Sequence, residues 1–292
     1  PDFHFLGMLL GQNVGGLWYW CLDQAIVQRV LSARSEAHAR ASTIFAGYLK
    51  LTPVFLMVLP GVVARRLYPA ELHGRTNEAL PLMMKRLLPP GLLGLNLAAT
   101  LAACMSSLDS VFTAAASLFC IDIYRPHLRP NAAEAELVRV GRAFCVLLAV
   151  LTIAWLPVIE LLSEQVFVYI QSISMYLAPP IVCVYFVGVL WSRANEHGAE
   201  AAFAVGYALG LSRMLGELVA KAHPPPPGSA VHALLLSNYL YAGAALFGVC
   251  VATHVGVSLA TPRPAQMQLH GLALRPGYMR RALRACGANL VA

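Results

Sequence analysis

Three residues whose oxygen atoms could bind a cation lie close together in one apolar stretch of the sequence. Ser106 and Ser107 follow Ala103 by three and four residues, so a helix would bring both hydroxyl groups near the Ala103 carbonyl. Oxygen ligands without a fixed charge suit a weakly held, hard monovalent cation. Small polar residues also hold membrane helices together. The spacing therefore leaves two interpretations open, a cation site and a contact between helices.

Chief among the charged residues within apolar stretches are Asp109 and Lys50, and charge at membrane depth is costly and usually functional. Asp109 follows Ser106 by three residues. It either pairs with a neighbouring helix or contributes to a cation or proton path. Lys50 has apolar turns on both sides within Gly47–Pro53. It is either a snorkelling or paired structural lysine or a hydrogen-bond donor that faces a polar cavity.

An aromatic cluster follows two adjacent glycines near the start of the chain. Trp18, Tyr19 and Trp20 come directly after Gly15-Gly16 and Leu17. Adjacent glycines can loosen a helix and let a ligand approach the backbone. The rings could stack on a sugar or close over a cavity, or they could belong to an interfacial aromatic belt. Asp23 follows Tyr19 by four residues, so we expect both on one helical face.

A third polar group precedes a double proline. Gln171 and Ser174 are three residues apart, so they share a helical face, and Pro179-Pro180 must kink that helix or free backbone groups. Gln171 either contacts a substrate through its amide or bonds to a neighbouring helix.

Catalytic patterns are missing from the sequence. It holds no HExxH, GxSxG, Walker or EF-hand motif, so we do not expect an enzyme. Arg213 and Glu217, four residues apart, are expected to form a structural ion pair.

The composition places these residues in a lipid bilayer. Of the 292 residues, 58% are hydrophobic and only 12% are charged, and the mean hydropathy is +0.64. Average soluble proteins carry about 25% charged residues. The net charge of +7 fits basic loops on one side of a membrane better than nucleic acid binding. We therefore expect the lipid bilayer as the partner and no nucleic acid.

Seven stretches are long and apolar enough to span a membrane, which takes about 20 residues. They cover residues 5–30, 41–64, 91–123, 137–160, 165–191, 198–220 and 230–260. Lys and Arg are more frequent in alternate loops and in the tail, which predicts a cytoplasmic C-terminus and an external N-terminus. The chain begins with Pro1 and has no basic segment before its first apolar stretch, so we expect a fragment without a signal peptide.

A series of short motifs resembles one known family over most of the chain. They occur in order at Trp18–Cys21, Asp23-Gln24, Gly47–Leu51, Met57–Gly61, Met105–Leu108, Asp122–Tyr124, Tyr169–Ser172 and Ala178–Pro180. The sequence resembles the sodium/solute symporters, and among them the sodium-glucose and sodium-myo-inositol cotransporters.

This resemblance implies an all-α membrane protein of the LeuT type, with two inverted five-helix repeats and its binding sites at the membrane midplane. The chain, with about seven transmembrane helices, then corresponds to the second half of such a transporter. Residues 1–191 would form the second repeat, 192–262 two peripheral helices and 263–292 a basic cytoplasmic tail. The missing N-terminal half would be a partner, since it supplies the rest of the binding sites.

The resemblance also implies roles for individual residues. Tyr19 matches an aromatic gate below the sugar and Trp20 its neighbour in the pocket. Lys50 matches a donor to a sugar hydroxyl and Gln171 a pocket amide, with Ser174 on the same face. The sodium ligands would be Ala103, through its carbonyl, with Ser106 and Ser107.

The implied function is sodium-coupled symport of a glucose-like hexose across the plasma membrane by alternating access, with sodium co-transported. Phe167-Val168 replaces an acidic position before Tyr169, which leaves the sugar open. Asp109 is Thr or Ala in glucose carriers and acidic in inositol-like ones, so an extra cation or proton site is possible there. The alternatives are symport of another solute such as myo-inositol and a sugar sensor that does not transport.

Overall fold

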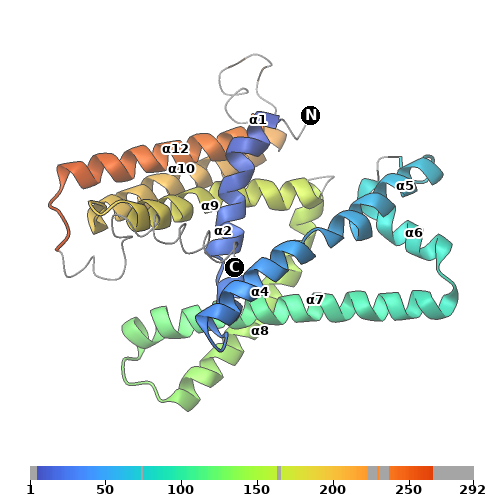
Figure 1. The fold of residues 1–292 in the computed structure, drawn as a ribbon, viewed down its shortest axis with the longest axis horizontal. Coiled ribbons are helices and arrows are strands. Elements are labelled where there is room, and N and C mark those ends of the chain that lie inside the picture. The colour runs from blue at the N-terminus through green and yellow to red at the C-terminus, as the bar shows by residue number, and fades with distance from the viewer. Residues whose placement is uncertain are drawn as a thin grey trace, which may run out of the picture. The chain divides into compact units, whose positions relative to one another are not determined.

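The structure is a computed structural model that describes residues 5–73, 75–162, 166–222, 226, 229 and 237–265. Every regular element in these residues is a helix (Figure 1). The chain forms two compact units, which we name unit 1 (Pro1–Leu22 with Ile170–Ala292) and unit 2 (Asp23–Tyr169).

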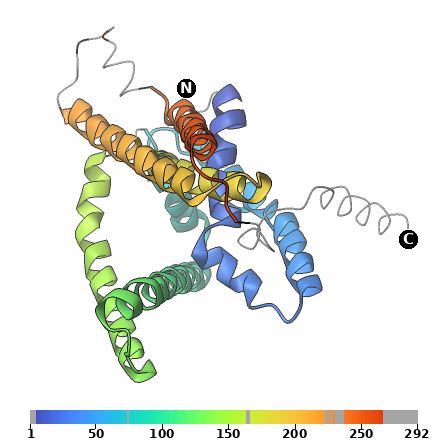
Figure 2. The same ribbon diagram turned by 90° about the vertical axis from the view of Figure 1, so that its left-hand side faces the viewer.

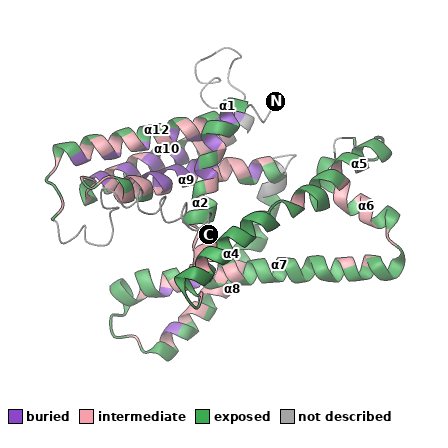
Figure 3. Cartoon of the chain, viewed as in Figure 1, coloured by how far each residue is buried: buried purple, intermediate pink, exposed green. Residues whose placement is uncertain are grey.

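Unit 1 is a group of closely packed helices. Its first segment is a continuous helical run of α1 (Phe5–Gly7), the π-helical η1 (Met8–Gln12) and α2 (Asn13–Cys21). The others are most of α9 (Val166–Leu190), α10 (Glu196–Ala222) and α12 (Tyr239–Ala260). Helices α10 and α12 pack side by side (Figures 1 and 2). Most buried residues described in this unit lie on the three long helices, and Gly7, Gly11, Val14 and Gly15 are buried on the first run (Figure 3).

Glycines allow the close packing of unit 1. A Cβ on Gly11 would lie 2.2 Å from the Leu240 carbonyl oxygen, so η1 approaches the backbone of α12. A Cβ on Gly206 would lie 2.6 Å from the Cβ of Pro180, so α10 packs against the double proline of α9. Helix α9 continues through both prolines as one element. Small residues at contacts let membrane helices approach one another in this way.

Unit 2 contains several shorter elements and two long helices. Along the chain these are α3 (Gln24–Leu31), α4 (Glu36–Leu49), η2 (Val54–Val58), α5 (Leu59–Leu67), η3 (Thr76–Glu78), α6 (Ala79–Leu87), α7 (Pro90–Leu118), η4 (Phe119–Leu128) and α8 (Glu134–Leu162). The turn after η4 brings α8 back along η4 and α7. The rings of Phe119 and Phe144 stack with centroids 4.2 Å apart, and the Tyr124 hydroxyl donates to Glu136 over 2.8 Å.

Polar side chains begin two helices of unit 2. The Asp23 carboxylate accepts from the backbone N–H of Ala25 at 2.8 Å and caps α3. The Ser35 hydroxyl accepts from the N–H of His38 at 3.3 Å and caps α4. Such caps satisfy N–H groups that have no partner within the helix.

Five helices in the described residues are long and apolar enough to cross a membrane. They are Glu36–Leu67, Pro90–Leu128, Glu134–Pro157, Val166–Leu190 and Tyr239–Ala260. By length and composition they agree with five of the seven expected spans. In the described residues the regular elements are therefore all helical, and five of the helices are candidate membrane spans.

The other two expected spans differ from what the sequence predicted. The first, 5–30, was expected to be continuous, but the helix ends at Cys21 and a second one begins at Gln24, because Asp23 caps the second. The sixth, 198–220, forms as part of α10, but it is not among the five. Arg213 and Glu217 lower the hydropathy of its apolar stretch.

The last two expected segments are described only in part. For the seventh span, 230–260, the helix begins at Tyr239 after the Asn238 cap, and residues 230–236 lie outside the described part of the chain. Of the tail, 263–292, only the residues up to Ala265 are described.

The two units bury their apolar surface to different extents. In the most apolar windows of α9 and α12, 39% and 22% of residues are buried, whereas none are buried in those of the three spans in unit 2. Leu101 and Met105 on α7, for example, are 65% and 70% exposed. Apolar surface of this extent suits contact with lipid or protein rather than water.

Candidate sodium and solute sites

The expected sodium ligands lie in the middle of α7, in unit 2. The Ser107 hydroxyl donates to the Ala103 carbonyl oxygen at 3.0 Å. This confirms the expected proximity of a hydroxyl and that carbonyl, although it does not test sodium binding. The Ser107 oxygen keeps two lone pairs that can accept a cation, and Ser106 stands beside it in the chain. This face of α7 thus presents uncharged oxygen atoms.

An arginine lies one turn from this group, a feature that the sequence did not indicate. The Ser110 hydroxyl donates to the Ser106 carbonyl at 2.9 Å, and the Arg29 guanidinium donates to the Ser110 hydroxyl. Arg29 lies in the last turn of α3, so this contact holds α3 against α7 within unit 2.

Asp109 lies on α7 but at the edge of the face formed by the oxygen ligands. Its side chain is exposed. At about 100° per residue, it lies about 60° around the helix from Ser106 and farther from Ser107. Asp109 is therefore a neighbour of the three ligands and not a fourth member of their face. Its role in a cation or proton path stays a prediction.

Lys50 lies where a candidate span is interrupted. Helix α4 ends at Leu49, and Lys50 is its C-cap residue, with its N–H donating to the Ala46 carbonyl at 3.0 Å. The Thr52 hydroxyl donates to the Leu49 carbonyl at 2.7 Å. Helical structure resumes at Thr52 and continues through Pro53. Broken helices carry the binding sites of many transporters. Pro53 is the sequence signal for this break.

The aromatic pair of unit 1 stands at the end of α2. Tyr19 and Trp20 meet edge to face, with ring centroids 5.1 Å apart and planes at 87°. They are 41% and 46% exposed, so their ring faces are accessible. The sequence predicted that Asp23 would share a helical face with Tyr19. This prediction was wrong, because α2 ends at Cys21 and Asp23 caps the next helix.

Gly15 allows a close contact between α2 and α9. A Cβ there would lie 2.3 Å from the terminal carbon of Met175, which is fully buried. The Met175 side chain therefore takes the space beside Gly15. Tyr19 lies one turn after Gly15 on α2, and Gln171 lies about one turn before Met175 on α9. Both residues therefore stand about 5–6 Å along their helices from this crossing point.

Ser174 is the other expected solute contact on α9. Its hydroxyl donates to the Ile170 carbonyl at 2.9 Å, which leaves the hydroxyl oxygen able to accept a hydrogen bond. Unit 1 thus carries Tyr19, Trp20, Gln171 and Ser174, and unit 2 carries Lys50, Asp109 and the three oxygen ligands.

Two residues after Ser174, a polar cluster connects α9 to α10. The Tyr176 hydroxyl donates to the Glu217 carboxylate. The Arg213 guanidinium carbon lies 5.8 Å from the centre of the Tyr176 ring, and Arg213 also donates to the Ser237 carbonyl at 2.8 Å. The sequence had indicated only a pairing of Arg213 with Glu217 on their own helix. Tyr176 was missed because it is 41 residues away from Glu217.

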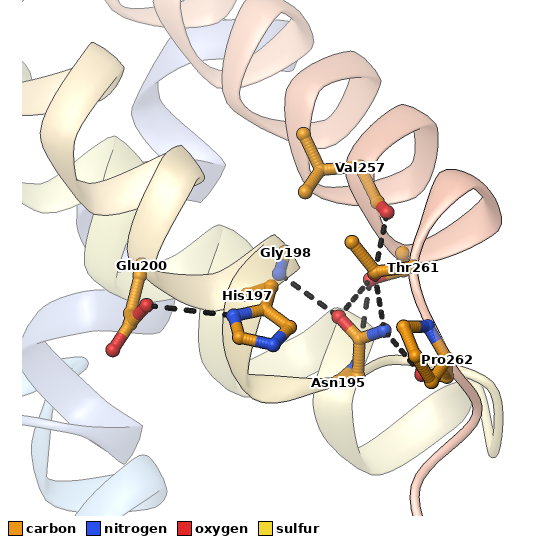
Figure 4. Close-up of polar contacts among 8 residues, drawn as sticks. Asn195, His197, Gly198, Glu200, Val257, Thr261 and Pro262 are labelled. Atoms are coloured by element: carbon orange, nitrogen blue, oxygen red, sulfur yellow. Dashed lines mark hydrogen bonds and ion pairs between the residues drawn. The ribbon is translucent and has the colours of Figure 1, made fainter.

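A second polar cluster fixes the start of α10 against the end of α12 (Figure 4). The Asn195 side-chain oxygen accepts from the Gly198 N–H at 2.9 Å and so caps α10. Its nitrogen donates to Thr261 at 2.6 Å and to the Pro262 carbonyl at 2.9 Å. A Cβ on Gly198 would lie 2.1 Å from the Ser258 hydroxyl. This cluster is structural, because it joins two helix ends.

Comparison with known proteins supports the family resemblance along most of the chain. The Sodium:solute symporter family matches residues 2–206. The chain is 39% identical over 285 residues to a sodium/myo-inositol cotransporter 2 of Sus scrofa, covering 91% of this chain and 42% of that protein. It is 40% identical over 294 residues to a sodium/mannose cotransporter of Bos taurus, covering 93% of this chain and 48% of that protein.

A human relative gives the same result. The chain is 38% identical over 288 residues to the sodium/myo-inositol cotransporter of Homo sapiens, covering 92% of this chain and 40% of that protein. The chain thus spans less than half the length of these curated relatives. The match over residues 2–206 and these identities establish that the chain belongs to the sodium:solute symporter family.

Proposed function

We propose that the chain forms the second half of a sodium-coupled symporter that carries a neutral sugar or polyol. The observation that carries this proposal is the oxygen face of α7, where the Ser107 hydroxyl lies 3.0 Å from the Ala103 carbonyl oxygen. Uncharged oxygen ligands can hold a monovalent cation and release it again, which a co-transported ion requires. The relatives are cotransporters by name and not enzymes.

The side chains of the expected pocket suit a neutral solute that is rich in hydroxyl groups. The exposed faces of Tyr19 and Trp20 suit stacking on a sugar ring. Lys50 offers N–H donors, and Gln171 offers both a donor and an acceptor for ring hydroxyls. The relatives are named for myo-inositol and mannose, both neutral and rich in hydroxyl groups. A glucose-like hexose is our first candidate, and myo-inositol is the alternative.

The architecture that we propose is the LeuT type, with alternating access between the two sides of the plasma membrane. Sodium bound at α7 would stabilise the outward-open state, in which the solute binds better. The membrane potential would contribute about 2.3 kcal/mol per charge per 100 mV. The break at Lys50 and the end of α2 after Trp20 fit the discontinuous helices that form midplane sites in such transporters.

Uptake measurements test this proposal. The chain is expressed in oocytes together with the N-terminal half of the Sus scrofa sodium/myo-inositol cotransporter 2, and each half is also expressed alone. We expect sodium-dependent accumulation of labelled glucose, mannose or myo-inositol only with both halves. Equal accumulation after replacement of sodium by choline would refute the coupling.

The same cells separate the transporter from a sensor. A sensor would give a sugar-induced current without accumulation of the labelled solute. Accumulation of labelled solute together with inward current supports symport.

We also propose that the C-terminal tail is cytoplasmic. An epitope at the C-terminus that antibodies reach without permeabilisation would contradict this.

A further inference from the structure

A cavity of about 430 Å³ lies within unit 1, and its lining includes none of the residues assigned to sodium and solute. Its walls come from α9, α10, α12 and the residue before the α12 cap. The lining residues include Tyr176, Arg213, Ser237, Tyr241, Ala245 and Val249. Helix α10 packs against α12 (Figure 1), and Gly210 of α10 and Gly243 of α12 lie close to Tyr176 and Met175 of α9. The cavity is therefore a property of one compact unit.

Polar groups are confined to one end of this cavity. Ser237 precedes α12, and Tyr241 lies in the first turn of that helix. From Tyr241 to Val249 the α12 wall continues for about 12 Å and is lined by Ala242, Ala245 and Leu246. Helix α12 is one of the candidate membrane spans. The polar end therefore stands at the end of a span, where the membrane interface would lie, and the apolar wall extends into the bilayer.

The charges at the polar end point to an uncharged head group. Arg213 brings a positive charge, and Glu217 brings a negative charge one turn further along α10. Both converge on Tyr176, through the ring and the hydroxyl respectively. Glu217 thus offsets the charge of Arg213, and the cluster as a whole has no net formal charge to attract a phosphate head.

The hydrogen-bonding groups favour a hydroxyl as the head. The Ser212 hydroxyl donates to the Leu209 carbonyl at 2.9 Å, which leaves its oxygen as an acceptor. The Arg213 guanidinium carries only donors. A hydroxyl group both donates and accepts, so it can satisfy both neighbours at once.

We propose that this cavity binds an uncharged, hydroxyl-headed membrane lipid, with its hydroxyl between Ser212 and Arg213 and its apolar body along α12 from Ala242 to Val249. A sterol and a diacylglycerol share this chemistry. Leu209, Tyr241 and Val249 are exposed at the rim, so the lipid enters sideways from the bilayer. This site is separate from sodium and solute binding, and its test does not depend on transport.

Photolabelling of the 292-residue chain in lipid nanodiscs tests the site. The probe is a sterol with a diazirine on its ring system, and mass spectrometry maps the labelled residues. We expect labels on α10 and α12 near Leu209 and Val249. Excess cholesterol or dioleoylglycerol should reduce the label, and the more effective competitor identifies the source. Competition only by dioleoylphosphatidylserine, or no label on these helices, would overturn the proposal.

A matched pair of variants gives the second test. Ala245→Trp fills the cavity from an exposed position on α12, and Leu259→Trp adds the same side chain to an exposed position on α12 outside the cavity. Label at the cavity should fall about tenfold in the first, a loss of about 1.4 kcal/mol in affinity, and stay unchanged in the second. Val249→Trp, with circular dichroism as a folding control, repeats the test from the apolar end. Undiminished labelling of both cavity variants would refute the site.

Discussion

The Ser107 hydroxyl donates a hydrogen bond to the Ala103 carbonyl oxygen, 3.0 Å away on the same face of α7. Ser117 makes the same kind of bond to the Thr113 carbonyl, at 2.8 Å, further along the same helix. The two serines therefore have the same local geometry, and only Ser107 lies in the proposed sodium site. This pair separates loss of a cation ligand from loss of a helix hydrogen bond.

Ser107→Ala should weaken sodium binding because it removes one oxygen ligand. We expect the sodium concentration for half-maximal uptake to rise about tenfold, equivalent to about 1.4 kcal/mol, in cells that express both halves. Ser117→Ala should leave this concentration unchanged. Equal sodium dependence in the wild type and Ser107→Ala would exclude this serine as a ligand.

Lys50→Met should weaken solute binding because it removes the ammonium donor and keeps a side chain of similar length. The KM for labelled sugar should rise about tenfold, as expected for a lost hydrogen bond from a charged group, while the sodium dependence stays close to that of the wild type. Lys85→Met, in the last turn of α6, is the control. A similar effect of both variants on KM would indicate a general effect of charge.

Gly11→Ala should destabilise unit 1, because its Cβ would lie 2.2 Å from the backbone oxygen of Leu240. Backbone cannot rotate away as a side chain can, so we expect a loss of about 1–3 kcal/mol. Gly16→Ala, in the same helical run, meets no atom within 4 Å and should be neutral or stabilising by up to about 1 kcal/mol. Thermal unfolding of the purified chain measures both. Equal melting temperatures would contradict the contact between η1 and α12.

Asn195→Ala should loosen the first turn of α10, because it removes the bond to the Gly198 N–H and those to Thr261 and Pro262. We expect amide hydrogen exchange in residues 196–200 to be about tenfold faster, which corresponds to about 1.4 kcal/mol. His197→Ala is the control, since His197 makes an exposed contact with Glu200 at 3.9 Å, and such pairs contribute about 0–1 kcal/mol. Unchanged exchange in Asn195→Ala would show that backbone contacts alone hold this turn.

Several features followed from the sequence because they depend on neighbours along one helix. The five candidate spans were predicted from hydropathy, since about 20 apolar residues suffice to cross a bilayer. The proximity of Ser107 to Ala103 followed from a spacing of four residues, which is a local property of any helix. The residues that mark the family likewise lie in short motifs. In contrast, the break at Asp23 was missed because its capping role depends on where one helix ends and the next begins.

The remaining features depend on contacts between residues that are distant in the sequence. Arg29 and Ser110 are 81 residues apart, and no spacing rule relates the end of α3 to the middle of α7. Gly15 was interpreted as a point of ligand approach, and only the packing of α9 showed that Met175 takes that space. The cavity of unit 1 exists because three helices meet around Tyr176 and Arg213. Helical periodicity fixes which residues share a face, but which faces meet is decided by packing between helices.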